Sequence, residues 1–459
     1  MTKQTDKNKR RQRDLLNGSV SLTLKQMTVP MIWGMILLMT FNLVDTFFVS
    51  LLGTAPLAAI SFTFPITFTV ISMAIGLGIG TSAVIAKTLG KGNKDEARDV
   101  ATVALLVSSL IVIVLSLLGY AFSEQIFTLL GAKTDLLPLI HQYMDLWFLG
   151  SVGLVGPMIG NAVLRASGDT HTPSMIMGAA GLINAVLDPL FIFGLGPIPA
   201  MGIKGAAIAT LVSWAFGLVF ITYILGVKRQ LIHLTLPSIA IVTDSTRQIL
   251  KIGLPAAGAN MLTPIAAAIM TAIVAGYGES AVAAFGVGSR IESIACLVVL
   301  AMSMTLPPFI SQNFGAEKLH RVEEAYRVSI RFVMIWQFGI YLVLLATAPL
   351  IAAAFAKEQA VADMIKLFIW ILPLGYGLQG IIILTNSSFN ALHKPMMALV
   401  LSVLRLFIFY VPLAYLGSVL FDLTGLFVGA VVGNLCMAIV SYVMFRKQFD
   451  SDKSLASSV

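Results

Sequence analysis

Long stretches of apolar residues, separated by short polar segments, make up almost the whole chain. A bilayer core of about 30 Å needs roughly 20 apolar residues in each helix that crosses it. A transmembrane β-barrel would instead show short segments of alternating polarity, and these stretches are continuous and too long. The pattern therefore predicts an all-α polytopic membrane protein. Its twelve expected spans lie near residues 28–52, 61–87, 100–122, 138–163, 173–194, 203–227, 249–275, 283–313, 328–355, 361–388, 396–417 and 425–445.

The composition agrees with this interpretation. Hydrophobic residues make up 58% of the chain and charged residues only 11%, against about 25% charged residues in a typical soluble domain. The basic N-terminal stretch "MTKQTDKNKRRQRDLL" lacks the short apolar segment and cleavage site of a signal peptide, so we expect a retained arm. Cys296 and Cys436 fall in different spans without the spacing of a disulfide framework or a metal site, which favours core packing.

The net charge of +8 is distributed by loop. Nearly all Lys and Arg residues lie on one side of the predicted spans, and the other side holds only Lys133, Lys204, Lys357 and Lys366. The positive-inside rule then places both termini in the cytoplasm, with a multi-pass chain in the inner (cytoplasmic) membrane. Because the basic residues do not gather on one soluble domain, no nucleic-acid partner is expected.

The two halves of the chain repeat one another. Pro30 matches Pro255, Gly53 matches Gly278 and Asn161 matches Asn386, and the spacing is the same in all three pairs. The stretch "VSLLGTAPLAAIS" aligns with "VAGYGESAVAAFG", and one gap is needed where "SGDTHTP" meets the shorter "LHKP". The repeat therefore predicts two six-helix lobes of the same orientation.

Such lobes imply a pseudo-two-fold axis along the membrane normal and a central cavity between them. Parallel repeats of this kind are typical of transporters, with the substrate site between the repeats. A duplicated structural bundle without transport is the alternative. The predicted parts are a basic cytoplasmic arm (1–27), an N-terminal lobe with a cation-coupling site (28–227), a cytoplasmic linker (228–247), a C-terminal lobe (248–446) and a cytoplasmic tail (447–459).

The acidic residues of the predicted spans do not follow the repeat. Asp45 aligns with Met270, and the segment "INAVLDPLFIF", with Asn184 and Asp188, aligns with "RLFIFYVPLAY", which has no carboxylate. A carboxylate inside a bilayer is costly and is usually functional. Since the second lobe keeps the helices without the acids, we infer a function for them in the N-terminal lobe.

The residue types at this place fit a small cation. Asn184 and Asp188 are four apart and share a helix face, and Pro189 leaves the carbonyl of Ala185 without its helical N–H partner. A carboxylate, an amide oxygen and a free carbonyl suit Na⁺, with Asp45 approaching from the first span. A proton fits equally, because burial and a second carboxyl group disfavour the charged form. Pairing of the acids with Arg290 or Arg405, for structure alone, is the alternative.

Other features of the sequence are less specific. Gly76, Gly78 and Gly80 lie inside a span without a preceding strand, which indicates helix packing and not a phosphate loop. Phe41, Phe64 and Met177 are candidates to line an adaptable drug cavity, with core packing as the alternative. The chain has no nucleotide-hydrolysis or covalent-catalysis motif. We therefore expect no enzyme and no cofactor, and an ion gradient as the energy source.

Four stretches carry a family resemblance: "VDTFFVS", "GNAVLRASGDTHTPSMIMG", "INAVLDPLFIFGLG" and "MGIKGAAIATLVS". Together they resemble the multidrug and toxic compound extrusion (MATE) family, most closely its DinF-like branch. The resemblance implies twelve helices in two pseudo-symmetric lobes. It also implies export of cationic or amphipathic compounds in exchange for H⁺ or Na⁺ by alternating access.

The resemblance also assigns residues. It implies a coupling site at Asp45, Asn184, Asp188 and Thr210, with Asn161 lining the same cavity. It makes Pro30 a first-span proline where bending has been proposed, so Pro30 and Pro189 are the candidate gating kinks. The NorM-like branch adds acidic residues in the C-terminal lobe, which this chain lacks at matching positions. At Phe41 some relatives have a tyrosine.

The leading hypothesis is a multidrug antiporter for drug-like cations, working as a monomer in the lipid bilayer. The alternative is a lipid-linked oligosaccharide flippase of the same superfamily. A pyrophosphate headgroup would need several Arg or Lys side chains in the cavity, and only Arg290 and Arg405 lie toward the middle of the spans. The sequence therefore favours cations as cargo.

Overall fold

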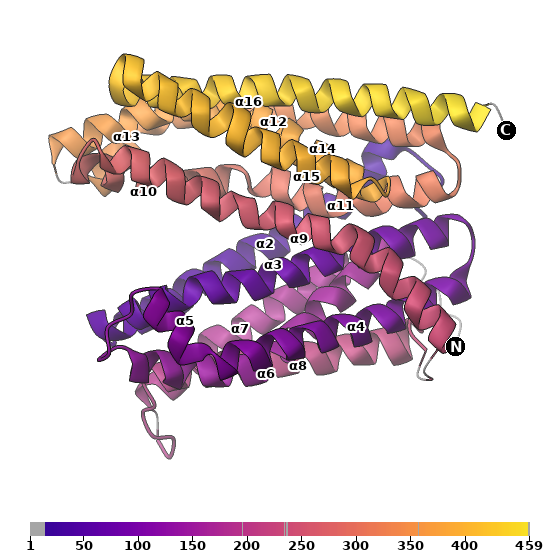
Figure 1. The fold of residues 1–459 in the computed structure, drawn as a ribbon, viewed down its shortest axis with the longest axis horizontal. Helices are drawn as coiled ribbons and strands as arrows, with labels where there is room; N and C mark the ends of the chain where they lie inside the picture. The colour runs from indigo at the N-terminus through magenta and orange to yellow at the C-terminus, as the bar shows by residue number, and fades with distance from the viewer. Residues whose placement is uncertain (1–13, 195, 234, 236, 357, 458–459) are drawn as a thin grey trace. The chain divides into compact units, whose positions relative to one another are not determined.

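The computed structural model describes residues 14–194, 196–233, 235, 237–356 and 358–457. Helices form the regular structure of this part of the chain (Figure 1). The helices are α2 (Val20–Ser50), α3 (Thr54–Gly90), α4 (Lys94–Ala121), α5 (Ser123–Leu129), α6 (Leu137–Ala166), α7 (His171–Phe193), α8 (Ile203–Tyr223), η1 (Ile224–Lys228), α9 (Ile239–Ala275), α10 (Glu279–Ala295), α11 (Leu297–Gly315), α12 (Leu319–Phe355), α13 (Gln359–Ile371), η2 (Leu372–Gly375), α14 (Tyr376–Ala391), α15 (Pro395–Leu404), η3 (Arg405–Tyr410) and α16 (Val411–Ser457).

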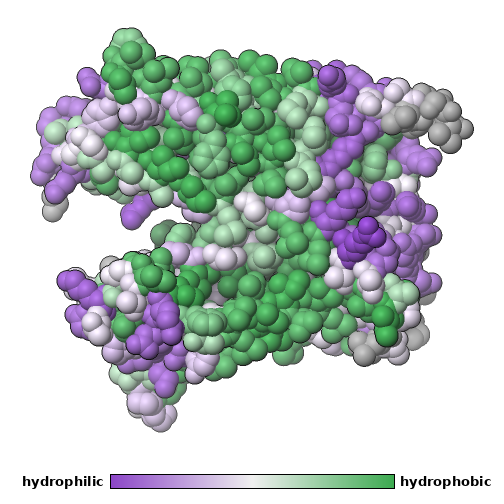
Figure 2. Space-filling view, viewed as in Figure 1, coloured by the Kyte–Doolittle hydropathy of each residue, from purple (hydrophilic) through white to green (hydrophobic). Residues whose placement is uncertain are grey.

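The helices confirm the predicted membrane architecture. Within the described residues, 11 helical segments are long and apolar enough to cross a membrane. The last of them contains two spans, because the backbone leaves the helical conformation at Phe421 and Asp422. The predicted span 283–313 is interrupted at Cys296, between α10 and α11. In each unit the surface seen in Figure 2 is hydrophobic along the middle of the helices and hydrophilic near their ends.

The chain divides into two compact units, one formed mainly by Lys25–Ala257 and the other mainly by Gly258–Val459. The division falls inside α9, which begins at Ile239. It therefore differs from the predicted linker at 228–247, and the predicted tail from 447 is part of α16. A helix satisfies its own backbone groups and can continue past the end of an apolar segment, so the loss of hydrophobicity did not mark these helix ends.

Backbone conformation shows that the repeat is structural. Positive φ angles occur at three pairs of positions that match in the repeat: Gly53 and Gly278, Gly92 and Glu317, and Gly168 and His393. Gly53 and Gly278 precede α3 and α10 with nearly the same angles, φ 107° and 98°. Glycine adopts this region without steric cost. The two halves thus turn in the same way at the same places.

Glycines on α6 allow α8 to pack closely within the first unit. Four glycines at helical spacing face four large α8 side chains in the same order along both helices, so the two helices run parallel. The pairs are Gly150 with Leu211, Gly153 with Trp214, Gly156 with Leu218, and Gly160 with Ile221. Small residues at helix interfaces are the usual way for membrane helices to approach.

The predicted packing role of the α3 glycines is confirmed for two of them. A Cβ atom added at Gly76 would collide with the backbone of Gly253 on α9, and one at Gly80 would collide with the carbonyl of Ile249. A Cβ atom at Gly78 would instead meet the side chain of Ala162 at 3.7 Å, an ordinary contact. Gly76 and Gly80 therefore set the distance between α3 and α9, and Gly78 does not.

We expect Gly76→Ala to destabilise the protein and Gly78→Ala to be tolerated. At Gly76 the new methyl group meets backbone that has to move, which costs about 1–3 kcal/mol, whereas alanine at Gly78 gains helix propensity. Thermal unfolding of both variants in the same detergent measures the difference. Equal melting temperatures would contradict this account of the α3–α9 contact.

A buried ion pair fixes the cytoplasmic end of α7, on the predicted topology. The Asp169 carboxylate accepts hydrogen bonds from the backbone N–H of Thr172 at 3.0 Å and from its hydroxyl at 2.7 Å. It also pairs with the guanidinium of Arg229, which follows η1. Both side chains are buried. The polar motif "SGDTHTP" therefore has a structural role, because its Asp169 joins the start of α7 to the end of the sixth span.

The second unit has an equivalent ion pair with reversed charges. Lys394, at the turn between α14 and α15, pairs with Asp452 near the end of α16. Lys394 occupies the position that matches Asp169 in the repeat, and Asp452 lies close to the position that matches Arg229. The repeat therefore keeps the ionic contact and exchanges the two charges.

Candidate ion-coupling site

Contacts between α2 and α7 bring the predicted acidic residues together. Cβ atoms added at Gly34, Gly178 and Gly181 would meet Ser174, Leu37 and Phe41 respectively. These contacts follow one another in the same direction along both helices, and the next turns carry Asp45 on α2 and Asp188 on α7. The Ser174 hydroxyl also donates to the carbonyl of Pro30. Small residues on α7 thus hold α2 in the register that places Asp45 beside Asp188.

Asp188 is fully buried inside the first unit. Its Oδ1 accepts a hydrogen bond from the Asn184 amide at 3.2 Å, and the same amide group lies 3.5 Å from the hydroxyl of Thr210 on α8. Its Oδ2 is buried without a hydrogen-bond partner in the described structure. Apart from the neighbouring Asp45 carboxyl, this oxygen can therefore be satisfied by a proton or by a small cation.

Asp45 and Tyr143 complete the cluster. The carboxyl groups of Asp45 and Asp188 face one another closely enough to interact directly. Tyr143, on α6, interacts with both of them. None of the ion pairs in the described residues includes Asp45 or Asp188, so the alternative of structural pairing with arginine is not what the structure shows. Arg290 is exposed, and Arg405 interacts with Glu292 in the second unit.

This arrangement suits a proton or a single small cation. Two adjacent carboxyl groups in an apolar surrounding repel one another when both are ionised, and either a shared proton or a bound cation relieves the repulsion. Among the described residues, no group of three or more His, Cys, Asp and Glu side chains forms a polyvalent metal site. For Na⁺, further oxygen ligands are available from the amide of Asn184 and the hydroxyl of Thr210.

The repeat supplies an internal comparison for this cluster. The positions equivalent to Asp45, Tyr143, Asp188 and Thr210, with the alignment gaps included, are Met270, Phe368, Tyr410 and Ala430. Met270, Phe368 and Ala430 belong to one hydrophobic core cluster, and Tyr410 packs against it. The second unit therefore has no carboxyl group at any of these positions, which shows that the fold does not need the acids there.

The other predicted site residues have different positions. Phe41 lies one turn before Asp45 and contacts α7, next to the cluster. Asn161 is buried five helical turns beyond Tyr143 on α6, about 27 Å further along the helix. Met177 is half-buried on α7, and Phe64 is exposed on α3, where its ring contacts Phe68. The structure thus brings Phe41, but not Asn161, to the acidic pair.

Neither proline interrupts its helix. Pro30 lies within α2 and Pro189 within α7, and both helices continue past them. Pro189 directly follows the buried carboxylate. The gating roles of both prolines remain predictions.

Tyr143 was missed in the sequence, where it stands in the polar stretch "HQYMD" near the start of a span. The available signal was the repeat, because its equivalent is Phe368. We expect Tyr143→Phe to lower ion-driven transport about tenfold, because the phenylalanine loses the hydroxyl that interacts electrostatically with both carboxyl groups, and a tenfold effect corresponds to about 1.4 kcal/mol. Tyr120→Phe, at an exposed tyrosine of α4, is the control. Equal transport by the two variants would remove Tyr143 from the site.

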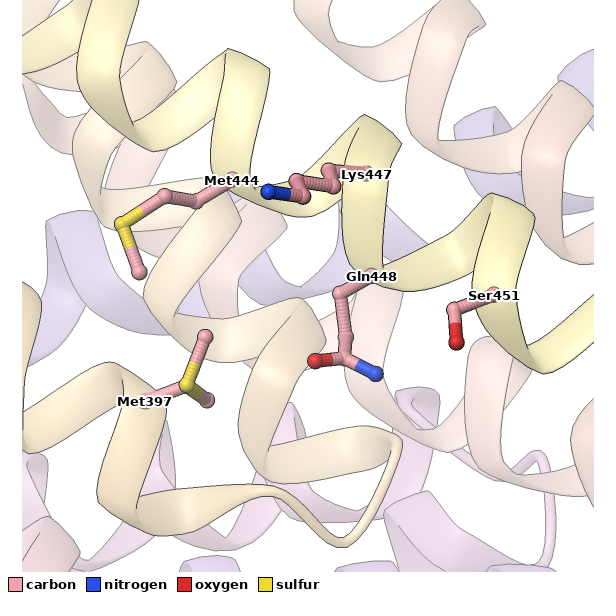
Figure 3. Close-up of a pocket in the computed structure, with 5 residues that line it drawn as sticks. All are labelled: Met397, Met444, Lys447, Gln448 and Ser451. Carbon is pink, nitrogen blue, oxygen red and sulfur yellow. The ribbon is translucent and has the colours of Figure 1, made fainter.

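A surface pocket lies elsewhere, in the second unit. It has a volume of about 380 Å³ and is lined by Met397 on α15 and by Met444, Lys447, Gln448 and Ser451 on α16 (Figure 3). Its one charged group, Lys447, is exposed. None of the predicted site residues lines it. The pocket therefore gives no support to a role in ion coupling.

The fold and the site together define a polytopic membrane transporter made of two repeated units. The MatE family model matches residues 30–190 and 255–416, once in each half. The chain belongs to this family, the MATE transporters.

Full-length relatives agree with the assignment. The chain is 41% identical to the "FAD transporter" of Shewanella oneidensis, over 94% of this chain and 96% of the relative. It is 27% identical to the "Probable multidrug resistance protein YpnP" of Bacillus subtilis, over the same shares. It is 23% identical to the "Multidrug export protein MepA" of Staphylococcus saprophyticus, over 95% and 96%.

Solved structures share the fold. The Vibrio cholerae MATE transporter VcmN in the bent form has a TM-score of 0.89 at 33% identity, covering 94% of this chain and 97% of VcmN. A superfamily transporter from Pyrococcus furiosus has a TM-score of 0.88 at 28% identity, covering 96% and 98%. The twelve-helix architecture is therefore that of known MATE transporters.

Proposed function

We propose that the protein is a secondary active exporter, driven by exchange for H⁺ or Na⁺ at Asp45 and Asp188 through alternating access. One observation carries this proposal. The buried carboxyl of Asp188 faces a second acid, has no cationic partner in the described structure, and lies in only one of two repeated units. Burial of two carboxyl groups within a membrane is energetically costly, and ionisable residues in such places usually have a function such as ion binding.

Two substrate classes follow from the relatives. The 41% identity to a protein named FAD transporter favours a flavin dinucleotide. The relatives named as multidrug proteins, at 27% and 23% identity, support the drug-like cations expected from the sequence. We propose the dinucleotide as the more strongly supported substrate, because this chain is more similar to the relative named FAD transporter than to the two relatives named as multidrug proteins. A lipid-linked oligosaccharide flippase finds no support in the names of these relatives.

We place the exporter in the inner membrane as a monomer, with both termini in the cytoplasm. The loop distribution of Lys and Arg supports this orientation, since only four of the basic residues lie on the opposite side. The DinF-like assignment rests on the acids of the first unit and on their hydrophobic equivalents in the second.

Transport by the purified protein in liposomes tests the proposal. FAD and ethidium are measured separately by fluorescence, with an imposed proton gradient and, in other vesicles, an imposed Na⁺ gradient. Movement of either compound above the level of protein-free vesicles under one of the gradients is the expected result. If neither compound moves under either gradient, these two proposed substrate classes are wrong.

A further inference from the structure

A second group of polar side chains lies inside the Gly258–Val459 unit. Its members are Glu292 on α10, Tyr376 and Gln379 on α14, and Arg405 and Tyr410 on η3. We propose that this group is an anion site that binds a phosphate group of the exported substrate. The proposal rests on the proposed export of a dinucleotide, and it names the part of the protein that recognises the phosphate.

Arg405 supplies the positive charge. Its guanidinium lies over the ring of Tyr410, 5.4 Å from the ring centre. It makes neither a hydrogen bond nor an ion pair with the described residues. A guanidinium within a membrane span is expected to have partners for its N–H groups. Here the Tyr410 ring contacts the flat face of the guanidinium. The N–H donors at the edge of the guanidinium remain available for two parallel hydrogen bonds to a phosphate.

Tyr376 supplies a second unused donor. The side chain is only 2% exposed, and its hydroxyl is buried without a hydrogen-bond partner in the described structure. The hydroxyl interacts electrostatically with Glu292 and Tyr410, so it lies at the same cluster. A buried hydroxyl without a partner costs free energy, and a bound ligand that accepts a hydrogen bond would remove this cost.

Glu292 is the local negative charge. It interacts with the amide of Gln379 and, across a longer distance, with Arg405. The remaining titratable groups that face the cluster are the hydroxyls of Tyr376 and Tyr410 and the thiol of Cys296. Around this one carboxylate the cluster presents a guanidinium, two phenol hydroxyls and an amide. This donor-rich set favours an anion over a cation.

The backbone of η3 places the two ends of this segment together. Arg405–Tyr410 is a π-helical stretch between α15 and α16. Hydrogen bonds in a π-helix join residues five apart, so Arg405 and Tyr410 come onto one face, and such stretches are frequent at functional sites. The equivalent part of the first unit, around Asn184 and Asp188, lies in the α-helix α7. The two units thus carry different polar groups at the same place in the repeat.

Binding of inorganic pyrophosphate, FAD and riboflavin to the purified full-length protein, measured by calorimetry, tests the site. We expect Arg405→Gln to weaken binding of pyrophosphate and FAD about tenfold or more, because charge-assisted hydrogen bonds are lost. Binding of riboflavin, which has no phosphate, should not change. The control is Arg327→Gln, at an exposed arginine of α12 in the same unit, which should bind all three compounds like the wild type.

Glu292→Gln gives a prediction of opposite sign that misfolding would not produce. Removing the negative charge beside Arg405 should tighten pyrophosphate binding several-fold. If the wild type binds no pyrophosphate, or binds it as well as Arg405→Gln does, the anion site is wrong. If Arg405-dependent binding is present but FAD is not transported, the site is supported and the proposed substrate is not.

Discussion

Asp188→Asn should reduce ion-driven transport to the level of protein-free vesicles. Asparagine has nearly the same shape and can still contact Asn184, but it can neither release a proton nor bring a negative charge to Na⁺. The folded state should be at least as stable as that of the wild type, because burial of a carboxylate without a counter-charge is costly. Transport in proteoliposomes and thermal unfolding of the same preparation measure the two effects separately.

The matched control is Asp145→Asn. Asp145 lies on α6 beside His141, with its side chain 40% exposed, and it takes no part in the cluster. The Asp145→Asn variant should transport at the wild-type rate. If Asp188→Asn also transported at the wild-type rate, Asp188 would have no role in coupling.

Asp169→Ala should lower the free energy of unfolding by about 3–5 kcal/mol, because removal of one partner leaves a buried charge uncompensated. The substitution leaves the buried Arg229 without its carboxylate and removes both hydrogen bonds to Thr172. Thermal unfolding in detergent measures the loss.

Asp95→Ala is the control for this prediction. Asp95 pairs with Arg98, but its side chain is 90% exposed, and solvent-exposed ion pairs contribute little. The Asp169 variant should therefore unfold at a clearly lower temperature than the Asp95 variant. Equal melting temperatures would show that the buried pair does not hold α7 to the end of the sixth span.

Much of the fold could be predicted, because membrane spans are long and strongly apolar. The constant spacing between matched residues such as Gly53 and Gly278 predicted a repeat, and matching positive φ angles at both glycines confirm it. Helix ends in water could not be placed in this way. α9 starts at Ile239 with four apolar residues that a polar stretch separates from the span, and the helical tail after residue 447 has no hydrophobic signal. The interruption at Cys296 lies within an apolar stretch.

The candidate site was predicted in part. Asn184 and Asp188 share a helix face, and this spacing alone places them together. The approach of Asp45 and Thr210 depends on contacts between helices. Asp45 was expected there because the second lobe lacks both acids, and Thr210 only through the family resemblance. Tyr143 was missed because a tyrosine near a helix end is usually an interfacial residue. Asn161 was predicted to line the cavity and not to join the acids, and its position along α6, about 27 Å from Tyr143, leaves that prediction untested.

The central claim is that Asp45 and Asp188 carry the ion that drives export. The most direct measurement is the flux of that ion in proteoliposomes after addition of the transported compound, with a pH-sensitive dye for H⁺ and radioactive sodium for Na⁺. We predict a compound-dependent flux of one of these ions in the wild type and none in the double variant Asp45→Asn, Asp188→Asn. An undiminished ion flux in the double variant would contradict the account.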